Sequence, residues 1–104
     1  MNRSIFMRHK QAKIDGIKVD VNIASLIQSL WNANINTYGS CQEKYPGRAW
    51  IGFNTSDDIW RFVKLTSNLQ DTSWEMCEYA CQIMFPNSLF NDIIKVVSKC
   101  NLYR

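Results

Sequence analysis

The sequence has no long hydrophobic run, because no uninterrupted apolar stretch exceeds four residues. A membrane-spanning helix needs about 20 consecutive apolar residues, and the central region of a signal peptide needs at least about 7. We therefore expect no membrane span and no secretion signal, and we predict a cytoplasmic protein.

Histidine is almost absent, since His9 is the only one in the chain. Ser-His-Asp and Cys-His arrangements would both require His9 to fold back onto the domain from its place near the N-terminus. The four cysteines, Cys41, Cys77, Cys81 and Cys100, include no Cys-x-x-Cys pair, which argues against a zinc site and favours reduced thiols. Glycine-rich phosphate-binding motifs are missing too. These absences predict no catalytic residues, no metal and no cofactor.

The chain does contain enough apolar material for a folded core, since 46% of its 104 residues are hydrophobic and only 20% are charged. No linker or internal repeat divides it, so we predict a single domain over residues 1–104. Basic residues gather only near the N-terminus, where we expect residues 1–13 to form a basic, flexible segment. The net charge of +3 is small for a protein that binds a phosphate backbone.

Turn chemistry and hydrophobic spacing predict the first elements. Asp15-Gly16 suits a type I′ turn and predicts a short hairpin between residues 11–14 and 17–21. A helix capped by Asn22 should follow. Its apolar residues recur at helical spacing and form one buried stripe, made of Ile23, Leu26, Ile27, Leu30 and Trp31.

Strands and helices alternate in the rest of the chain. Residues 35–42 and 48–53 predict two antiparallel strands, Thr55 begins a helix through Leu65, residues 74–85 predict one long strand, and a last helix follows Pro86-Asn87. The order β-α-β-β-α-β-α predicts an α+β fold, a ferredoxin-like two-layer sandwich whose antiparallel sheet carries the helices on one face. The expected core includes Ile27, Leu30, Trp31, Ile51, Phe62 and Ile94.

The densest group of unusual residues lies on the strand predicted over residues 35–42. Short polar side chains follow one another there, and Gly39 allows a ligand or another backbone to approach closely. Across the hairpin, an Arg and a Trp can pair with and stack on a planar anionic group. We therefore predict a shallow ligand site formed by Thr37, Tyr38, Ser40, Cys41, Gln42, Arg48 and Trp50. An ordinary polar sheet surface and a reactive Cys41 are the alternatives.

A longer pattern carries a resemblance to a known group of proteins. Its parts are Leu30-Trp31, Ile35-x-Thr37, Ser40-Cys41-Gln42 and Ala49-Trp50-Ile51-x-Phe53. Together they resemble a family of small uncharacterised proteins of bacteria and their phages, over roughly residues 17–97. The resemblance implies no assigned activity.

The lack of catalytic parts, beside one concentrated polar and aromatic patch, favours a non-catalytic binding module. We expect it to hold a small anionic or nucleotide-like ligand, or to block a host protein, as phage anti-defence proteins do. One alternative is an RNA-binding domain with the topology of an RNA-recognition motif, because residues 46–53 partly fit its aromatic strand. Weak nucleic-acid binding would then follow. The other is a small enzyme that uses Cys41. A homo-oligomer is a further possibility that the sequence leaves open.

Overall fold

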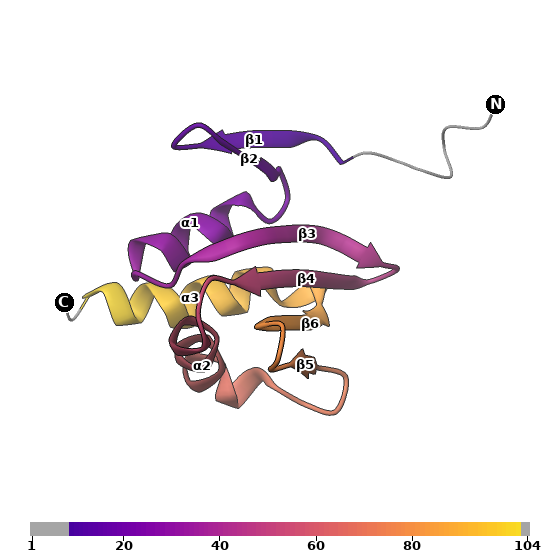
Figure 1. The fold of residues 1–104 in the computed structure, drawn as a ribbon, viewed down its shortest axis with the longest axis vertical. Helices are drawn as coiled ribbons and strands as arrows, with labels where there is room; N and C mark the ends of the chain where they lie inside the picture. Colours follow the sequence, from indigo (N-terminus) through magenta and orange to yellow (C-terminus); the bar gives the residue numbers. More distant parts are fainter. Residues whose placement is uncertain (1–8, 103–104) are drawn as a thin grey trace.

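The computed structural model describes residues 9–102, which form an α+β fold (Figure 1). The elements follow the order β1 (Gln11–Ile14), β2 (Ile17–Asp20), α1 (Ala24–Asn32), β3 (Thr37–Tyr45), β4 (Arg48–Phe53), α2 (Ser56–Leu65), the 3-10 turn η2 (Ser67–Leu69), β5 (Glu75–Cys77), β6 (Gln82–Pro86), the 3-10 turn η3 (Asn87–Leu89) and α3 (Phe90–Leu102).

Strands β1 and β2 form the predicted hairpin, which is a two-stranded sheet of its own. Asp15 and Gly16 both have positive φ angles, 51° and 83°, as a type I′ turn requires. The hairpin contacts α1 and the edge strand β3. Figure 1 shows it lying above both elements.

The ends of helices α1 and α2 are stabilised by different contacts. Thr55 caps α2 as predicted, because its hydroxyl oxygen accepts a hydrogen bond from the N–H of Asp58 at 3.1 Å. The predicted cap of α1 is wrong, since Ile23 occupies that position and no side chain caps it. At the other end of α1, the Arg61 guanidinium of α2 donates to the carbonyl oxygens of Ala33 and Asn34. These bonds satisfy the carbonyl groups of the two residues that follow α1 and tie the end of that helix to α2.

The second sheet has four antiparallel strands in the order β3-β4-β6-β5, and the three helices lie on one side of it (Figure 1). Its strands alternate between a buried and an exposed face, with Ala49, Ile51 and Phe53 on the buried side of β4. Four of the six predicted core residues, Ile27, Leu30, Ile51 and Phe62, are fully buried. The other two, Trp31 and Ile94, are partly buried and pack against this core.

The long strand predicted over residues 74–85 is wrong. The chain turns back between β5 and β6, and these two short strands pair antiparallel with each other. Cys81 takes a left-handed conformation, with φ 54°, just before β6 begins. Apolar residues recur at every second position through this turn, at Cys77, Tyr79, Cys81 and Ile83, so a period of two does not reveal it.

The ferredoxin-like order β-α-β-β-α-β-α is not confirmed. Such a sandwich would include the strand before α1 in the main sheet, but β2 pairs only with β1 among the described residues. The physical reason is the tight Asp15-Gly16 turn, which folds β2 back onto β1. What the structure shows is an antiparallel α+β arrangement with its helices on one face.

The N-terminal segment predicted over residues 1–13 is only partly described. Residues 1–8 lie outside the described residues, whereas residues 11–13 belong to β1 and are not a tail. No helix within residues 9–102 has the length and apolar character needed to cross a membrane.

Candidate functional site

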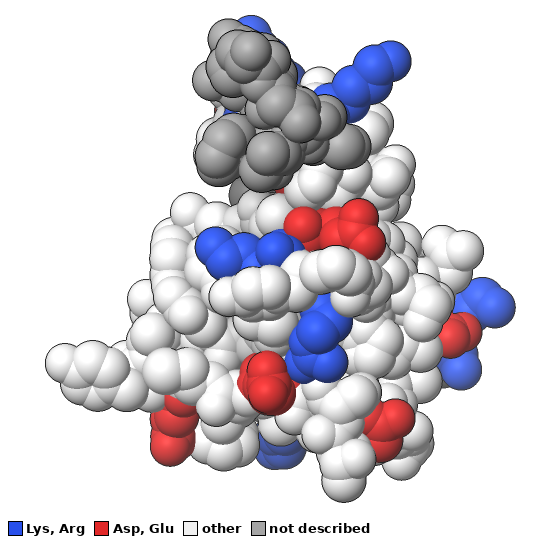
Figure 2. Space-filling model, turned by 90° about the vertical axis from the view of Figure 1, so that its right-hand side faces the viewer, with Lys and Arg blue, Asp and Glu red and all other residues white. Residues whose placement is uncertain are grey.

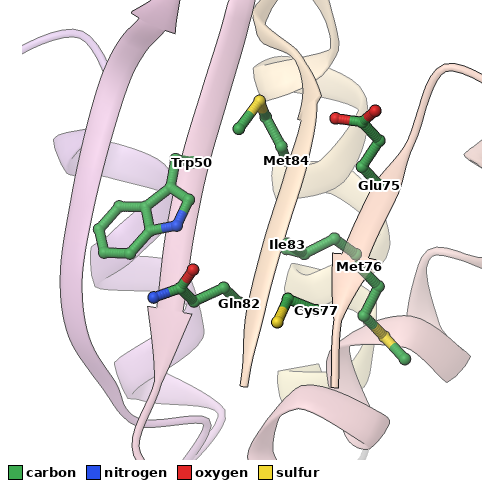
Figure 3. Close-up of a pocket in the computed structure, with 7 residues that line it drawn as sticks. All are labelled: Trp50, Glu75, Met76, Cys77, Gln82, Ile83 and Met84. Carbon is green, nitrogen blue, oxygen red and sulfur yellow. The ribbon is translucent and has the colours of Figure 1, made fainter. Parts of the chain in front are cut away.

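The face of the four-stranded sheet turned away from the helices is the candidate site, and we call it the open face. Strand register sets two rows of residues across it. One row runs Cys41, Trp50, Met84, Glu75, and the other runs Gly39, Gly52, Gln82, Cys77. Figure 3 views this face and shows Trp50, Gln82 and Met84 in front of the strands, with the helices behind.

Trp50 occupies the centre of the open face, on the inner strand β4. Its six-membered ring reaches β3, where a Cβ built on Gly39 would lie only 3.1 Å from Cζ3 of the indole. The close approach that Gly39 permits is therefore made by the protein's own tryptophan. The ring is only half-buried, so part of its surface faces solvent.

Tyr38 is the second aromatic residue of this face. Its ring meets the Trp50 ring edge to face, with centroids 6.0 Å apart and planes at 76°. The phenol donates to the carbonyl oxygen of Ala80 at 3.2 Å and accepts from the Gln82 amide at 2.8 Å. The ring lies so close over Gly52 that a Cβ there would come within 2.4 Å of Cζ. Tyr38 is thus held in place although 55% of its surface is exposed.

A hollow of about 180 Å³ lies beside Trp50. Its lining residues come from β4, β5 and β6 and are Trp50, Glu75, Met76, Cys77, Gln82, Ile83 and Met84 (Figure 3). The volume is below the roughly 300 Å³ at which pockets for drug-sized ligands begin. The hollow therefore suits one small planar group.

Two cations border the open face. Lys44 places its ammonium nitrogen 5.8 Å from the centroid of the Trp50 ring, a cation–π distance. Arg48 donates to the carbonyl oxygen of Ser73 at 2.5 Å and pairs with Glu75 at 3.4 Å. Arg48 therefore links the loop before β5 to β4, a structural role that the sequence does not predict.

Three of the predicted site residues, Thr37, Tyr38 and Ser40, line a different cavity of about 240 Å³. It lies between β2 and β3, and Ile27 and Trp31 of α1 also line it. Thr37 accepts a hydrogen bond from the indole N–H of Trp31 at 3.0 Å, which fixes β3 to α1. The seven predicted residues therefore do not meet in one pocket.

Gln42 and Cys41 connect β3 to the hairpin. The Gln42 backbone N–H donates to the Asp20 carboxylate at 3.0 Å, and the Gln42 side chain accepts from the Asn22 N–H at 2.8 Å. Cys41 places its Sγ 3.8 Å from Nδ1 of His9, which itself lies 2.9 Å from the Asp20 carboxylate. The single histidine does fold back onto the domain, and it meets a cysteine and a buried aspartate there.

Burial raises the pKa of the Cys41 thiol, and the nearby Asp20 carboxylate raises it further. For Asp20, burial acts in the same upward direction, but hydrogen bonds from Gln42, His9 and Gln11 outweigh it and lower the pKa of the carboxyl. The side chain of Asp20 is thus an anion inside the protein. The pKa of the Cys41 thiol is therefore raised, whereas the activated thiolate that the enzyme alternative needs has a lowered pKa.

Charge is mixed on the side of the molecule that Figure 2 shows. Figure 2 shows basic and acidic side chains lying beside one another on one side of the molecule. The coloured side chains in this view form no broad region of one sign. The mixture agrees with the small net charge of +3.

Sequence reasoning missed the parts of the site that come from β5 and β6. Gln82, Met84, Glu75 and Cys77 complete the hollow beside Trp50. The available signal was the alternation in β6, where buried Ile83 and Phe85 leave Gln82 and Met84 on the opposite face. The turn before β6 obscured which residues would join them.

The chain matches no known family model, and comparisons with curated proteins and with solved structures find no match either. The resemblance to a small bacterial and phage family therefore stays a prediction. The site has to be interpreted from its own chemistry.

Proposed function

We propose that this protein is a non-catalytic binding module that holds a small planar ligand, of nucleobase or nucleotide chemistry, on the open face. The observation that carries the proposal is the half-buried Trp50 ring at the centre of a sheet face that no described helix covers, next to a hollow of about 180 Å³. An indole in this setting offers a flat surface for stacking.

Polar groups around the ring give the site chemical selectivity. The Gln82 amide lies beside the indole (Figure 3), and an amide can both donate to and accept from the edge of a base. Lys44 is within reach of an anionic group attached to a stacked base, because its ammonium already lies over the ring. Tyr38 packs against the indole in an edge-to-face contact.

Titration of the full chain with the four ribonucleoside monophosphates tests the proposal. Binding should quench tryptophan fluorescence, and Trp50→Ala should weaken the affinity by about 5- to 150-fold, the equivalent of roughly 1–3 kcal/mol for one stacked base. Trp60→Ala is the matched control, because Trp60 is an exposed tryptophan that lies on α2 and lines neither cavity. Binding that survives Trp50→Ala, or no binding of any of the four, would refute the proposal.

Single-stranded RNA is a second candidate, favoured by two neighbouring aromatic rings and one cation on a four-stranded antiparallel sheet. The two candidates differ in their dependence on salt. Each phosphate contact lowers the logarithm of the affinity by about 0.7 per tenfold rise in salt. A short RNA that binds with a slope of several such units, and more tightly than a mononucleotide, would favour the RNA candidate.

A role in blocking a host protein, and with it an anti-defence role, stays a prediction. Exposed aromatic side chains such as Tyr45 and Tyr79 suit a protein partner as well as a ligand. The enzyme alternative has the least support, because the surroundings of Cys41 raise the pKa of its thiol.

A further inference from the structure

His9, Asp20 and Cys41 form a cluster of three different metal-ligand types at the edge where the hairpin meets β3. One ligand atom from each residue can be chosen so that all three lie within 4.8 Å of one another. The residues come from three separate segments, namely the chain before β1, the end of β2 and the middle of β3. From this geometry we infer that the cluster is a binding site for a divalent zinc ion, with Nδ1 of His9, the carboxylate of Asp20 and Sγ of Cys41 as ligands.

The distances are close to those of a tetrahedral zinc site. Zn–N and Zn–O bonds of about 2.0–2.1 Å and a Zn–S bond of about 2.3 Å separate the N and O ligands by roughly 3.3 Å and the S and N ligands by roughly 3.6 Å. The corresponding separations here are 2.9 Å between His9 and Asp20 and 3.8 Å between Cys41 and His9. These two separations lie within about 0.4 Å of the tetrahedral values. The third, between Cys41 and Asp20, is at most 4.8 Å, so that pair must close by no more than about 1.2 Å. The fourth position is left for water.

The ligand types select the metal. A thiolate beside an imidazole and a carboxylate is a borderline-soft set, which zinc accepts, whereas magnesium and calcium prefer oxygen ligands alone. The charges also balance, because one thiolate and one carboxylate neutralise the two positive charges of the ion. As the Zn–S bond forms, the Cys41 thiol releases its proton to solvent. Nδ1 of His9, which donates to the Asp20 carboxylate, also gives its proton to solvent while Nε2 takes one up, so the neutral ring binds the ion through Nδ1 and the ion replaces the hydrogen bond.

Neighbouring groups already hold the carboxylate in position. Gln11 donates to Oδ1 of Asp20 at 3.1 Å, and the Gln42 N–H donates to Oδ2 at 3.0 Å. Outer contacts of this kind orient the first ligands of a metal site. Asp20 is only 7% exposed, so its carboxylate is a buried anion held in a fixed position. His9 and Cys41 are half-buried, so an ion can reach the cluster from solvent past these two side chains.

The inference is tested on the reduced, chelator-treated full chain with cobalt(II) as the spectroscopic probe and zinc as its competitor. We expect one cobalt ion per chain with thiolate-to-cobalt charge-transfer absorption, and we expect zinc to displace it. Cys41→Ser should abolish the charge-transfer absorption, and Cys77→Ser, at an exposed cysteine on β5, should leave it unchanged. The absence of saturable binding, or charge transfer that persists in Cys41→Ser, would overturn the inference.

Three further variants locate the ion. His9→Ala and Asp20→Asn should each weaken zinc affinity by more than the roughly 10- to 100-fold that we expect for Gln11→Ala, which removes an outer contact only. Trp50→Ala should leave zinc binding unchanged, so failure of the ligand proposal and failure of this inference are distinguishable. Equal effects of Gln11→Ala and Asp20→Asn would contradict the assignment of Asp20 as a ligand.

A measurement on the unaltered chain covers the case in which a variant does not fold. Zinc should slow alkylation of Cys41 by iodoacetamide, followed peptide by peptide by mass spectrometry, and should leave the rate at the exposed Cys77 unchanged. Equal protection of both cysteines, or of neither, would speak against the site.

Discussion

Gly52→Ala tests how the open face is built, because the effect of this small change should depend entirely on Tyr38. A Cβ at this position would lie 2.4 to 2.7 Å from three carbon atoms of the Tyr38 ring. Gly52 does not have a positive φ angle, so alanine itself fits the backbone. The exposed tyrosine is the part that can move. We therefore expect Gly52→Ala to push the ring off the sheet without unfolding the protein.

The size of the effect follows from what Tyr38 would lose. Two hydrogen bonds of its hydroxyl contribute about 0.5 kcal/mol each at the low end that suits an exposed group, and its edge contact with Trp50 about 0.5–1.5 kcal/mol. The loss is thus roughly 1.5–2.5 kcal/mol. Alanine regains about 0.5–1 kcal/mol, because glycine is entropically unfavourable in a strand. The net decrease in the free energy of unfolding should be about 0.5–2 kcal/mol.

A double-mutant cycle measured by urea unfolding isolates this effect. In a Tyr38→Ala background no ring opposes the new methyl group, so Gly52→Ala should there stabilise the protein by about 0.5–1 kcal/mol. The sign of the effect should thus reverse between the two backgrounds. If Gly52→Ala has the same effect in both, Tyr38 does not rest on Gly52 and our description of the open face is wrong.

Three further predictions concern other parts of the fold. Thr55→Ala should lower the free energy of unfolding by about 1 kcal/mol in urea, because it removes the cap that accepts from the Asp58 N–H; a loss near zero would contradict the cap. Trp31→Ala should cost about 3 kcal/mol, the lower end for such a change, because the indole is only half-buried. The hydroxyl and N–H of Ser73 lower the pKa of the Asp71 carboxyl, so Ser73→Ala should raise that pKa in an NMR titration. A carboxyl whose pKa is lowered on folding stabilises the protein above its unfolded pKa of about 3.9, and this contribution is lost as the pH falls through the folded value. The stability difference between the Ser73→Ala variant and the original chain should therefore be present at neutral pH and vanish in acid.

Local signals predict the β1–β2 turn, the Thr55 cap and the helix α1, although the local signal for an Asn22 cap was wrong. The Asp15-Gly16 pair and the Thr55 cap were read correctly because each acts through bonds within a few residues. The hydrophobic stripe predicted α1 for the same reason, since helical spacing alone brings Leu26, Ile27 and Leu30 to one face. These parts of the fold needed no knowledge of distant contacts.

The cluster of His9, Asp20 and Cys41 could not be predicted from local signals. His9 precedes Cys41 by 32 residues and Asp20 by 11, and no spacing rule joins them. Their meeting depends on where the β1–β2 hairpin docks, which is set by long-range bonds such as that from the Gln42 N–H to Asp20. A lone histidine in a basic segment carries no sign of this contact, which explains why the sequence argued against a metal site.

One extra residue in β3 determines how the two proposed sites are arranged. Thr37 pairs with Phe53 and Gly39 with Gly52, so Tyr38 is a bulge with no partner of its own in β4. In a regular strand Thr37, Gly39 and Cys41 would share one face. The bulge instead lets Thr37 bond to Trp31 on the helix side, while Cys41 stays in register with Trp50 on the open face. Tyr38 is left free to cover Gly52 and support the indole. Deleting the extra residue would turn the side chains on one side of the bulge to the opposite face of the sheet. The same strand could then no longer form both the contact with α1 and the open face.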